Sequence, residues 1–262
     1  MRLVSYDGGF GRVEDDRVVP MGADLVAHLA GEEPAQDAAP IPLAELTLLA
    51  PVPRPGKVLC IGLNYRDHAA ETGKPLPTVP MLFAKFANSV VRDGATVPIP
   101  AATQEVDWEA ELGVVIGRTV KDVPVGDALD AVAGYCCLND LSARDLQRST
   151  TQFTLGKAID GFLPMGPWLV TRDEIPDPQD LAISCTVNGR LAQQSSTREM
   201  VFGVAELVSF LSRTMTLEPG DVIATGTPPG VGVARTPPWF LQPGDEVVVE
   251  IEGLGRLTTH MA

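Results

Sequence analysis

The sequence feature that most constrains this chain is residues 105–118, where a polar start gives way to an apolar run rich in β-branched residues. Such a run, ended by Gly117, predicts a buried strand. Alternate side chains of a strand share a face, so Glu109 and Glu111 are expected to point the same way, with Cα atoms roughly 7 Å apart. Two carboxylates leading into a buried strand repel each other and resist burial. A divalent cation with oxygen ligands would resolve this conflict, and the alternative is a pair of solvated edge residues.

A third acidic residue favours the metal site over the solvated pair. Asp140 follows the apolar run at residues 131–138, so it stands where a second predicted strand ends. A polar side chain at a strand end is well placed to join a site. Glu109, Glu111 and Asp140 therefore form the predicted set of metal ligands.

Length, composition and charge bound the class of protein. A chain of 262 residues, 45% of them apolar, can form one large domain or a large and a small one. Its 25 glycines and 23 prolines favour many turns and short strands over long helices. A net charge of −14 argues against nucleic acid or an anionic membrane surface as the main partner.

The cellular compartment is predicted from the lack of a membrane-spanning run and a signal peptide, and from the spacing of the cysteines. No apolar run is long enough to span a bilayer, and residues 1–9 lack the apolar core of a signal peptide, so we expect a cytoplasmic protein. The cysteines show no C-x-x-C spacing, and they are expected to be buried, reduced thiols. They are Cys60, Cys136, Cys137 and Cys185.

Residues 1–50 are predicted to form a small N-terminal domain, and residues 51–262 the main one. The expected elements of the small domain are two strands that pair with each other and one short helix, at residues 2–6, 16–20 and 24–30. Asp24 would cap the helix. Residues 31–40 have the composition of a linker.

In the main domain, a predicted strand at residues 57–62 leads into a short helical pattern at residues 65–72. His68 and Glu71 would then be neighbours on the helix, three positions apart. A carboxylate that orients an imidazole and raises its basicity is a general-base arrangement, and the alternative is a surface helix with an incidental histidine. Three prolines follow, so the helix lies in a loop that could move as a lid.

Several further elements carry polar residues that could reach a site. We expect a strand at residues 81–86 with Lys85 in an apolar setting, and a helical turn at residues 142–147 with Arg144 and Gln147 on one side. Lys157 stands between apolar residues. A short helix is expected at residues 124–133, a loop and strand at 164–170, and a hairpin around Asn188-Gly189 joining 181–188 to 190–194.

The longest helix is predicted to begin near Ser196, because Ser196 and Glu199 have the spacing of a capping box. Apolar residues recur at helical spacing after it, and this stripe is expected to be core or subunit contact. Its members are Met200, Val201, Val204, Leu207, Val208 and Leu211.

Two Pro-Gly-Asp turns, within residues 217–221 and 241–245, each lead into a β-branched run and are interpreted as scaffold. The segment between them, residues 224–235, is rich in glycine. It lacks the Lys-Ser/Thr of a phosphate loop, and Arg235 stands where a dinucleotide fingerprint needs glycine. We therefore expect a tight turn that presents Thr227 and backbone groups to a site.

In combination, these motifs resemble the fumarylacetoacetate hydrolase family over residues 57–256. The stretches that carry the resemblance occur in one order along the chain. They are residues 62–68 with Glu71, 107–112, 139–147, 225–228 and the two Pro-Gly-Asp turns.

The resemblance implies an α+β, mostly β fold, in which a roll of β-sheets follows a small N-terminal α/β domain, and usually a homodimer. It implies Mg²⁺ or Mn²⁺ held by the three acidic residues already named. It assigns the His68–Glu71 pair to water activation on a mobile lid. Residues 148–156 vary within the family and do not identify the substrate. The resemblance and the apolar setting of Lys85 together predict these pocket residues: Lys85, Arg144, Gln147, Lys157 and Thr227.

The predicted reaction is hydrolysis of a C–C bond in an acylpyruvate or a related 2,4-dioxo acid. The metal would stabilise an enolate, Lys157 would add positive charge to it, and His68 would activate water. The same core serves decarboxylation of oxaloacetate or isomerisation of a 2-hydroxymuconate-type diacid, and the fold does not select among them. Outside enzymes, the alternative is a β protein whose acidic cluster binds a structural cation.

Overall fold

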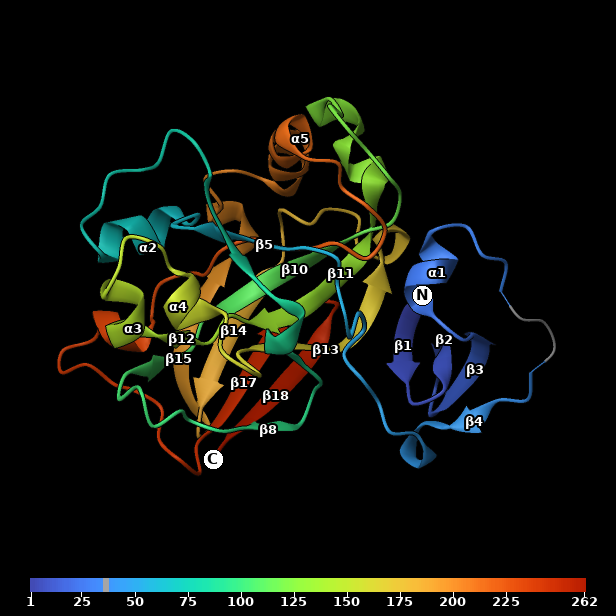
Figure 1. Ribbon diagram of the computed structural model, residues 1–262, viewed down its shortest axis with the longest axis horizontal. Helices are drawn as coiled ribbons and strands as arrows, with labels where there is room; N and C mark the ends of the chain where they lie inside the picture. The colour runs from blue at the N-terminus through green and yellow to red at the C-terminus, as the bar shows by residue number, and fades with distance from the viewer. Residues whose placement is uncertain (35–37) are drawn as a thin grey trace.

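The computed structural model describes residues 1–34 and 38–262 of the chain. Within these residues β-strands make up most of the regular secondary structure and the helices are short, so the fold is α+β and mostly β, as predicted (Figure 1). A helix with the length and hydropathy to cross a membrane does not occur in this part of the chain. The predicted linker at residues 31–40 includes residues 35–37, which lie outside the described residues.

The largest sheet has the strand order β4-β3-β2-β1-β13-β11-β10-β16-β5-β6, with β7 paired to β13. The predicted strands at residues 57–62 and 81–86 are β5 and β6, which lie at one end of this order. Along the chain, the members of the sheet are β1 (Arg2–Tyr6), β2 (Gly9–Glu14), β3 (Arg17–Gly22), β4 (Ile41–Pro42), β5 (Val58–Gly62), β6 (Met81–Lys85), β7 (Val90–Val91), β10 (Ala110–Ile116), β11 (Val132–Asn139), β13 (Leu163–Thr171) and β16 (Val222–Ala224).

A second sheet, in the order β15-β14-β17-β18-β8, packs against β10, β11 and β13 of the first. The predicted hairpin around Asn188-Gly189 is confirmed as its β14–β15 pair. Its strands are β8 (Ala95–Val97), β14 (Ala182–Val187), β15 (Arg190–Ser196), β17 (Glu246–Ile251) and β18 (Gly255–Met261). Two very short strands, β9 (Val106–Asp107) and β12 (Ser142–Ala143), pair separately.

The helices lie in the connections between strands. Asp24 caps α1 as predicted, accepting a hydrogen bond from Val26 N at 2.7 Å. The α-helices are α1 (Leu25–Leu29), α2 (Arg66–Glu71), α3 (Arg144–Arg148), α4 (Thr154–Lys157) and α5 (Val204–Thr214). Turns of 3₁₀ helix are η1 (Leu43–Glu45), η2 (Ala87–Ser89), η3 (Val125–Ala131), η4 (Arg172–Glu174), η5 (Thr197–Glu199) and η6 (Gly232–Ala234). The short helix predicted at residues 124–133 is therefore the 3₁₀ helix η3.

Strand β10 is buried on both faces because all of its residues except Glu111 are apolar, and the last three are β-branched. All seven of its residues are buried. Leu112 and Val114 belong to the main hydrophobic cluster between the two sheets, whereas Val115 belongs to a second cluster shared with β5 and β16. Burying each such side chain contributes about 1.5–3 kcal/mol. The alternation of faces is thus satisfied by two cores, one on each side of the sheet.

The directions of the central strands bring several chain segments to one edge. β10 runs antiparallel to both β11 and β16, with Glu111 opposite Leu138 and Gly113 opposite Ala224. β16 is parallel to β5. The start of β10 therefore lies beside the ends of β11, β16 and β5, and the residues that follow these three strands gather there.

The predicted pairing of residues 2–6 with residues 16–20 is wrong, because β2 lies between β1 and β3 and pairs with both. Glycine weakens a strand pattern in the sequence, and β2 contains Gly9 and Gly11. The structure gives the reason for one of them: a Cβ at Gly11 would lie 2.5 Å from Val19 O of the neighbouring strand.

The N-terminal strands continue the sheet of the main body. β1 pairs antiparallel with β13, with Arg2 opposite Val170. Figure 1 shows β1 to β4 and α1 gathered on one side of the molecule, next to β13. The domain boundary at residue 50 stays a prediction, and one sheet spans both sides of it.

The predicted start of the longest helix at Ser196 is also wrong, because α5 begins at Val204. The physical reason is Asn64, which lies far away in the sequence. Its backbone oxygen accepts from Val201 N at 2.7 Å, and its side-chain oxygen accepts from Phe202 N at 2.9 Å. These contacts hold residues 201–202 in a bend before the helix and use their N–H groups, so the helix does not include them.

The apolar stripe of this helix is core, one of the two predicted outcomes. Glu206 caps the helix in place of the predicted pair, accepting from Gly203 N at 2.7 Å. The stripe members buried in the main cluster are Met200, Val204, Leu207, Val208 and Leu211.

Both Pro-Gly-Asp turns lead into strands, β16 and β17, as predicted. In each turn the aspartate accepts the N–H three residues earlier, at 2.8 Å, from Glu218 to Asp221 and from Gln242 to Asp245. The cysteine prediction is confirmed as well, since all four are free and buried.

Asn64 offers a test of how residues 201–202 are held. Its side chain is fully buried and donates to Phe202 O and Thr225 O at 3.0 and 2.8 Å, besides accepting from Phe202 N. Asn64→Ala removes three buried hydrogen bonds and is expected to lower the free energy of unfolding by about 3 kcal/mol. Urea denaturation measures this change.

The matched control is Asn88→Ala. Asn88 also donates two hydrogen bonds, to Ala158 and Asp160, but it is exposed, so water can replace them. Equal losses of stability in the two variants would contradict the role assigned to Asn64.

Candidate active site

Three carboxyl groups meet at the edge where β10 begins and β11 and β16 end. Glu109, Glu111 and Asp140 each place a carboxylate oxygen within 4.8 Å of the others, and all three residues are buried. The residues predicted to be metal ligands are thus together in space. Such a group of three acids can hold a metal ion.

Backbone contacts from three chain segments fix these carboxylates. Glu109 lies one residue before β10, yet its O accepts from Asp140 N at 2.9 Å and its N donates to Asn139 Oδ1 at 3.1 Å. Glu111 accepts from Gly226 N at 2.8 Å. Gly226 has a φ of 99°, a conformation that glycine adopts readily, and this aims its N–H at the carboxylate.

Two buried lysines compensate part of the negative charge. Lys157 Nζ lies 2.6 Å from Glu109 Oε2 and 2.8 Å from Asp140 Oδ2. Lys85 Nζ lies 2.6 Å from Asp140 Oδ1 and also donates to Leu141 O. Charge-assisted contacts of this kind are strong in a buried setting, and losing one partner leaves an uncompensated charge.

Lys157 reaches the cluster because α4 packs closely on the segment that contains α3. A Cβ at Gly156 would lie 2.5 Å from both Ala143 O and Gln147 N, so only glycine permits this approach. The Lys157 ammonium also lies 5.1 Å from the centre of the Phe83 ring, a cation–π contact.

Burial and neighbouring charges shift the pKa values of Glu109 and Glu111 in opposite directions. Burial opposes ionisation of Glu109, but the charges of Lys157 and Arg144 outweigh it and lower the pKa of Glu109 to about 2. Burial raises the pKa of Glu111 well above its usual value, and the charges of Asp140 and Glu109 raise it further. Burial also disfavours the charged form of Lys157, yet Asp140 and Glu109 raise its pKa. Glu111 is thus the carboxyl group whose charge is least compensated.

The chemistry of the donor set fits a hard divalent cation. All three ligating groups are carboxylates, and the cluster contains neither histidine nor cysteine. Mg²⁺, Mn²⁺ and Ca²⁺ prefer oxygen ligands, whereas zinc sites use nitrogen and sulfur more often. Three protein ligands would leave coordination positions for water and substrate.

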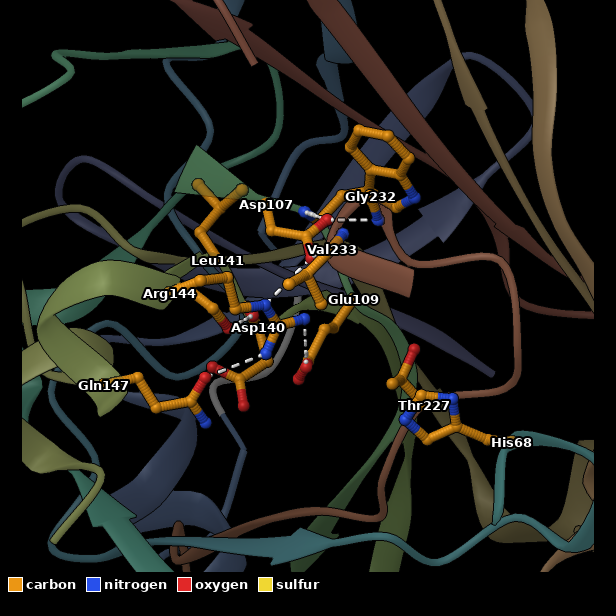
Figure 2. A network of polar contacts seen from close by, with 12 residues as sticks. His68, Asp107, Glu109, Asp140, Leu141, Arg144, Gln147, Thr227, Gly232 and Val233 are labelled. Atoms are coloured by element: carbon orange, nitrogen blue, oxygen red, sulfur yellow. Dashed lines mark hydrogen bonds and ion pairs between the residues drawn. The ribbon is translucent and has the colours of Figure 1, made fainter. Parts of the chain in front are cut away.

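Arg144 joins the acidic cluster to a second buried carboxylate, that of Asp107 (Figure 2). Its Nε donates to Asp107 Oδ2 at 2.8 Å, its Nη2 lies 2.7 Å from Glu109 Oε1, and its Nη1 donates to Gln147 Oε1 at 3.0 Å. Burial disfavours the guanidinium charge, but Asp107 and Glu109 outweigh that cost and raise the pKa of Arg144. Arg144 and Gln147 lie side by side, as their spacing predicted.

Asp107 also holds the loop that forms one wall of the site. It is fully buried and accepts from Gly232 N at 2.6 Å and from Val233 N at 3.1 Å. The sequence patterns did not predict this role for Asp107. The signal that could have found it is an acid set between buried apolar residues, Val106 and Trp108, which needs internal partners.

His68 and Glu71 form the predicted pair on α2. His68 Nδ1 lies 2.9 Å from Glu71 Oε2, so Nε2 is the nitrogen left to face the site. Glu71 Oε1 accepts from Gly230 N at 2.9 Å, which ties α2 to the glycine-rich loop. Figure 2 shows the His68 ring next to Thr227, on the side of the site away from Gln147.

Two more contacts hold α2 on the body of the protein. Asp67 accepts from Ser195 Oγ of β15 at 2.5 Å, and Arg66 donates to Met200 O at 2.5 Å. The predicted movement of this helix as a lid stays a prediction.

A cavity of about 430 Å³ connects these groups. Of the residues predicted for the site, Glu71, Asp140 and Lys85 do not line it, because they lie behind His68 and behind the other cluster residues. The predicted residues that line it are His68, Glu109, Glu111, Arg144, Gln147, Lys157 and Thr227.

Gln193 is a second residue that the sequence did not reveal. It is buried, accepts from Ala110 N at 2.9 Å, and donates to Thr227 Oγ1 at 2.8 Å. Thr227 in turn donates to Ala110 O at 3.0 Å. Gln193 therefore fixes Thr227 beside the start of β10. It lies on β15 next to other polar residues, Gln194, Ser195 and Ser196, so no local pattern distinguishes it and its role depends on tertiary structure.

Comparison with known proteins establishes the family. The sequence profile described as "Fumarylacetoacetate (FAA) hydrolase C-terminal" matches residues 57–262. The chain therefore belongs to the fumarylacetoacetate hydrolase family, as its motifs indicated.

Relatives of this chain carry several reaction names. "Oxaloacetate tautomerase FAHD2B, mitochondrial" from Bos taurus is 52% identical over 217 residues, which cover 82% of this chain and 69% of the relative. A solved fumarylacetoacetate hydrolase from Exiguobacterium antarcticum has 38% identity and a TM-score of 0.88, covering 100% of this chain and 99% of that one. A 5-carboxymethyl-2-hydroxymuconate delta-isomerase from Mycobacterium smegmatis has 37% identity and a TM-score of 0.86, with coverage of 100% and 98%.

The cluster geometry predicts the effect of a single ligand change. Glu111→Gln keeps the size of the side chain and an acceptor for Gly226 N, but removes the least compensated charge. Since changes in the surroundings of metal ligands alone cost about 10–100-fold in affinity, we expect Glu111→Gln to weaken Mn²⁺ binding by at least about 100-fold. Titration calorimetry with Mn²⁺ measures this loss.

The control for this change is Glu250→Gln, because Glu250 is exposed and pairs only loosely with Arg256, at 3.7 Å. Its Mn²⁺ affinity should equal that of the unmodified protein. Unchanged affinity in Glu111→Gln would remove Glu111 from the ligand set.

Proposed function

We propose that this protein is a divalent-cation-dependent enzyme that catalyses keto–enol tautomerisation of oxaloacetate or a closely related 2-oxo diacid. The observation that carries the proposal is one cavity lined by Glu109, Glu111, Lys157 and His68. Asp140, the third carboxylate, and Glu71, the partner of His68, lie directly behind these residues. The 52% identity to an oxaloacetate tautomerase supports this choice of reaction.

In this proposal Glu109, Glu111 and Asp140 hold Mg²⁺ or Mn²⁺, both of which take oxygen ligands. When bound, such a cation supplies positive charge to the oxygens of a 2-oxo acid and makes the C–H next to the oxo group more acidic.

The protein's own groups then move one proton. Tautomerisation moves a proton between C3 of the acid and the oxygen on C2. His68 Nε2 takes the proton from C3 as the enolate forms, and the resulting imidazolium gives it to the oxygen on C2; the reverse sequence restores the oxo form. Glu71 Oε2, 2.9 Å from Nδ1, fixes the ring orientation and its tautomer. Lys157 adds positive charge where the enolate oxygen develops.

Hydrolysis of an acylpyruvate, which the sequence alone ranked first, becomes the second candidate. The His68–Glu71 pair favours it, because a base at the cavity could activate water. The relative from Exiguobacterium antarcticum is named a fumarylacetoacetate hydrolase at 38% identity, and a relative from Burkholderia ambifaria at 52% identity carries a hydrolase name that states no substrate. The tautomerase, also at 52% identity, is the more similar of the relatives whose names state a substrate. Decarboxylation of oxaloacetate uses the same enolate without needing a base at His68.

A side-by-side assay separates these reactions. Protein loaded with Mg²⁺ is given enol oxaloacetate and, separately, an acylpyruvate, and the enol absorbance and the products are followed with and without chelator. We expect chelator-sensitive loss of the oxaloacetate enol without release of pyruvate. Pyruvate release would indicate decarboxylation, and carboxylate release from the acylpyruvate would indicate hydrolysis. A chelator that lowers only the melting temperature, with no reaction present, would indicate a structural cation.

His68→Gln tests the proton transfer. Loss of a general acid–base group costs about 10²–10⁴-fold in rate, so we expect kcat for oxaloacetate to fall by at least about 100-fold while Mn²⁺ affinity is unchanged. His260→Gln is the matched control, because His260 is exposed on β18 and its Nδ1 lies 3.9 Å from Glu246 Oε2, too far for a hydrogen bond. Full activity in His68→Gln would contradict the assigned role.

We also propose a homodimer in the cytoplasm. Exposed apolar side chains on and beside the edge strand β6 support an association between copies, and they include Leu76, Val79, Met81, Leu82 and Phe86. Light scattering on the purified protein measures the mass in solution. The bovine relative is named as mitochondrial, so the compartment of this chain needs its own measurement.

A further inference from the structure

The charges around the inner part of the cavity balance the charge of one substrate carboxylate. Four buried acids, Asp107, Glu109, Glu111 and Asp140, face three buried bases, Lys85, Arg144 and Lys157. With all of them ionised, one negative charge remains. A divalent cation would turn this into one net positive charge, which matches the single carboxylate of a 2-oxo acid core.

Arg144 is not free to bind a second carboxylate by charge alone. Two carboxylates already contact its guanidinium, those of Asp107 and Glu109, and Gln147 accepts a third hydrogen bond. The protein's own carboxylates therefore neutralise its positive charge, although two of its five N–H groups stay available for hydrogen bonds.

Two further basic residues line the same cavity, Lys74 and Arg148. Both are exposed, in contrast to Arg144 and Lys157. The chain has 34 acidic and 20 basic residues, so two bases at one opening run against its overall negative charge.

The backbone fixes both residues relative to the candidate catalytic groups. Lys74 N donates to Ala69 O at 3.0 Å, which ties Lys74 to the end of α2, the helix of His68. Arg148 is the last residue of α3, whose first residue is Arg144. Its guanidinium donates to Glu105, which leaves other N–H groups for a ligand.

The charge at this opening matches a second carboxylate. Lys74 and Arg148 bring two positive charges, and Glu105 neutralises one, so one net positive charge remains. In the described part of the chain, Lys74 forms neither a hydrogen bond nor an ion pair with its side chain.

We propose that Lys74 and Arg148 form a subsite for the distal carboxylate, which makes the enzyme selective for dianionic 2-oxo acids over monoanionic ones. This inference rests on the proposed function, since the same cavity binds the 2-oxo acid core. The cavity of about 430 Å³ has room for a chain longer than that of oxaloacetate. The selected class is therefore 2-oxo diacids, and not one chain length.

Two inert ligands with the same core test the subsite. Oxamate presents a carboxylate beside an amide carbonyl, and N-oxalylglycine adds a second carboxylate to that core; neither has an enolisable C–H beside the carbonyl. Calorimetry with Mg²⁺-loaded protein gives both affinities. We expect N-oxalylglycine to bind more tightly by about tenfold, which corresponds to about 1.4 kcal/mol. Added salt should reduce this advantage, because the subsite is exposed.

The double variant Lys74→Met, Arg148→Met should abolish the preference while the affinity for oxamate stays unchanged. With oxaloacetate, KM should rise and kcat should change little, because the distal carboxylate is remote from the reacting carbon. The control is Arg54→Met with Arg213→Met, which removes two positive charges from exposed positions that do not line this cavity.

The outcomes separate this inference from the proposed function. If the unmodified protein turns over oxaloacetate but binds both ligands equally, or if the double variant keeps the preference, the subsite is overturned and the proposed function stands. If the control variant loses the preference as well, overall charge and not a subsite causes it, and the inference is overturned. If neither ligand binds and oxaloacetate does not react, both fail.

Discussion

Four carboxyl groups, those of Asp107, Glu109, Glu111 and Asp140, lie in a region from which water is largely excluded. Because these groups are desolvated and repel one another, the surrounding structure has to supply positive charge and hydrogen-bond donors. It supplies three cationic side chains and several backbone N–H groups, and each comes from a different part of the chain. Removing one partner of such a buried pair typically costs about 3–5 kcal/mol. The close packing of α4 on α3 and the shape of the glycine-rich loop both serve this compensation.

Strand direction explains why the compensating groups can meet. Because β10 runs opposite to β11 and β16, the residues before one strand and after the other two share an edge of the sheet. The middle of these strands is apolar and packs into two cores, while the ends carry the polar groups. The chemistry of the site therefore depends on the loops at this edge, and the sheet holds them in place.

Much of this arrangement could be predicted from the sequence, for identifiable reasons. The apolar run of β10, the i, i+3 spacing of His68 and Glu71, and the Asn188-Gly189 turn are local signals, and local signals determine these elements. The start of α5 could not be predicted, because residues 201–202 donate hydrogen bonds to Asn64, which is distant in the sequence. Asp107 acquires its role only when Gly232 and Arg144 fold against it, and Lys85 was placed in the pocket although it lies behind Asp140.

The pairing of β1 with β13 has a consequence for how the chain is made. β1 is synthesised long before its partner β13, which is complete only at Thr171. Contacts between such distant segments form late, since a long loop has to close first. Until then β1 can pair only with β2, and the edge that will meet β13 is open. An open strand edge can pair with other chains, so strands β1 to β4 can misassociate during synthesis. They are protected once β1 pairs with β13.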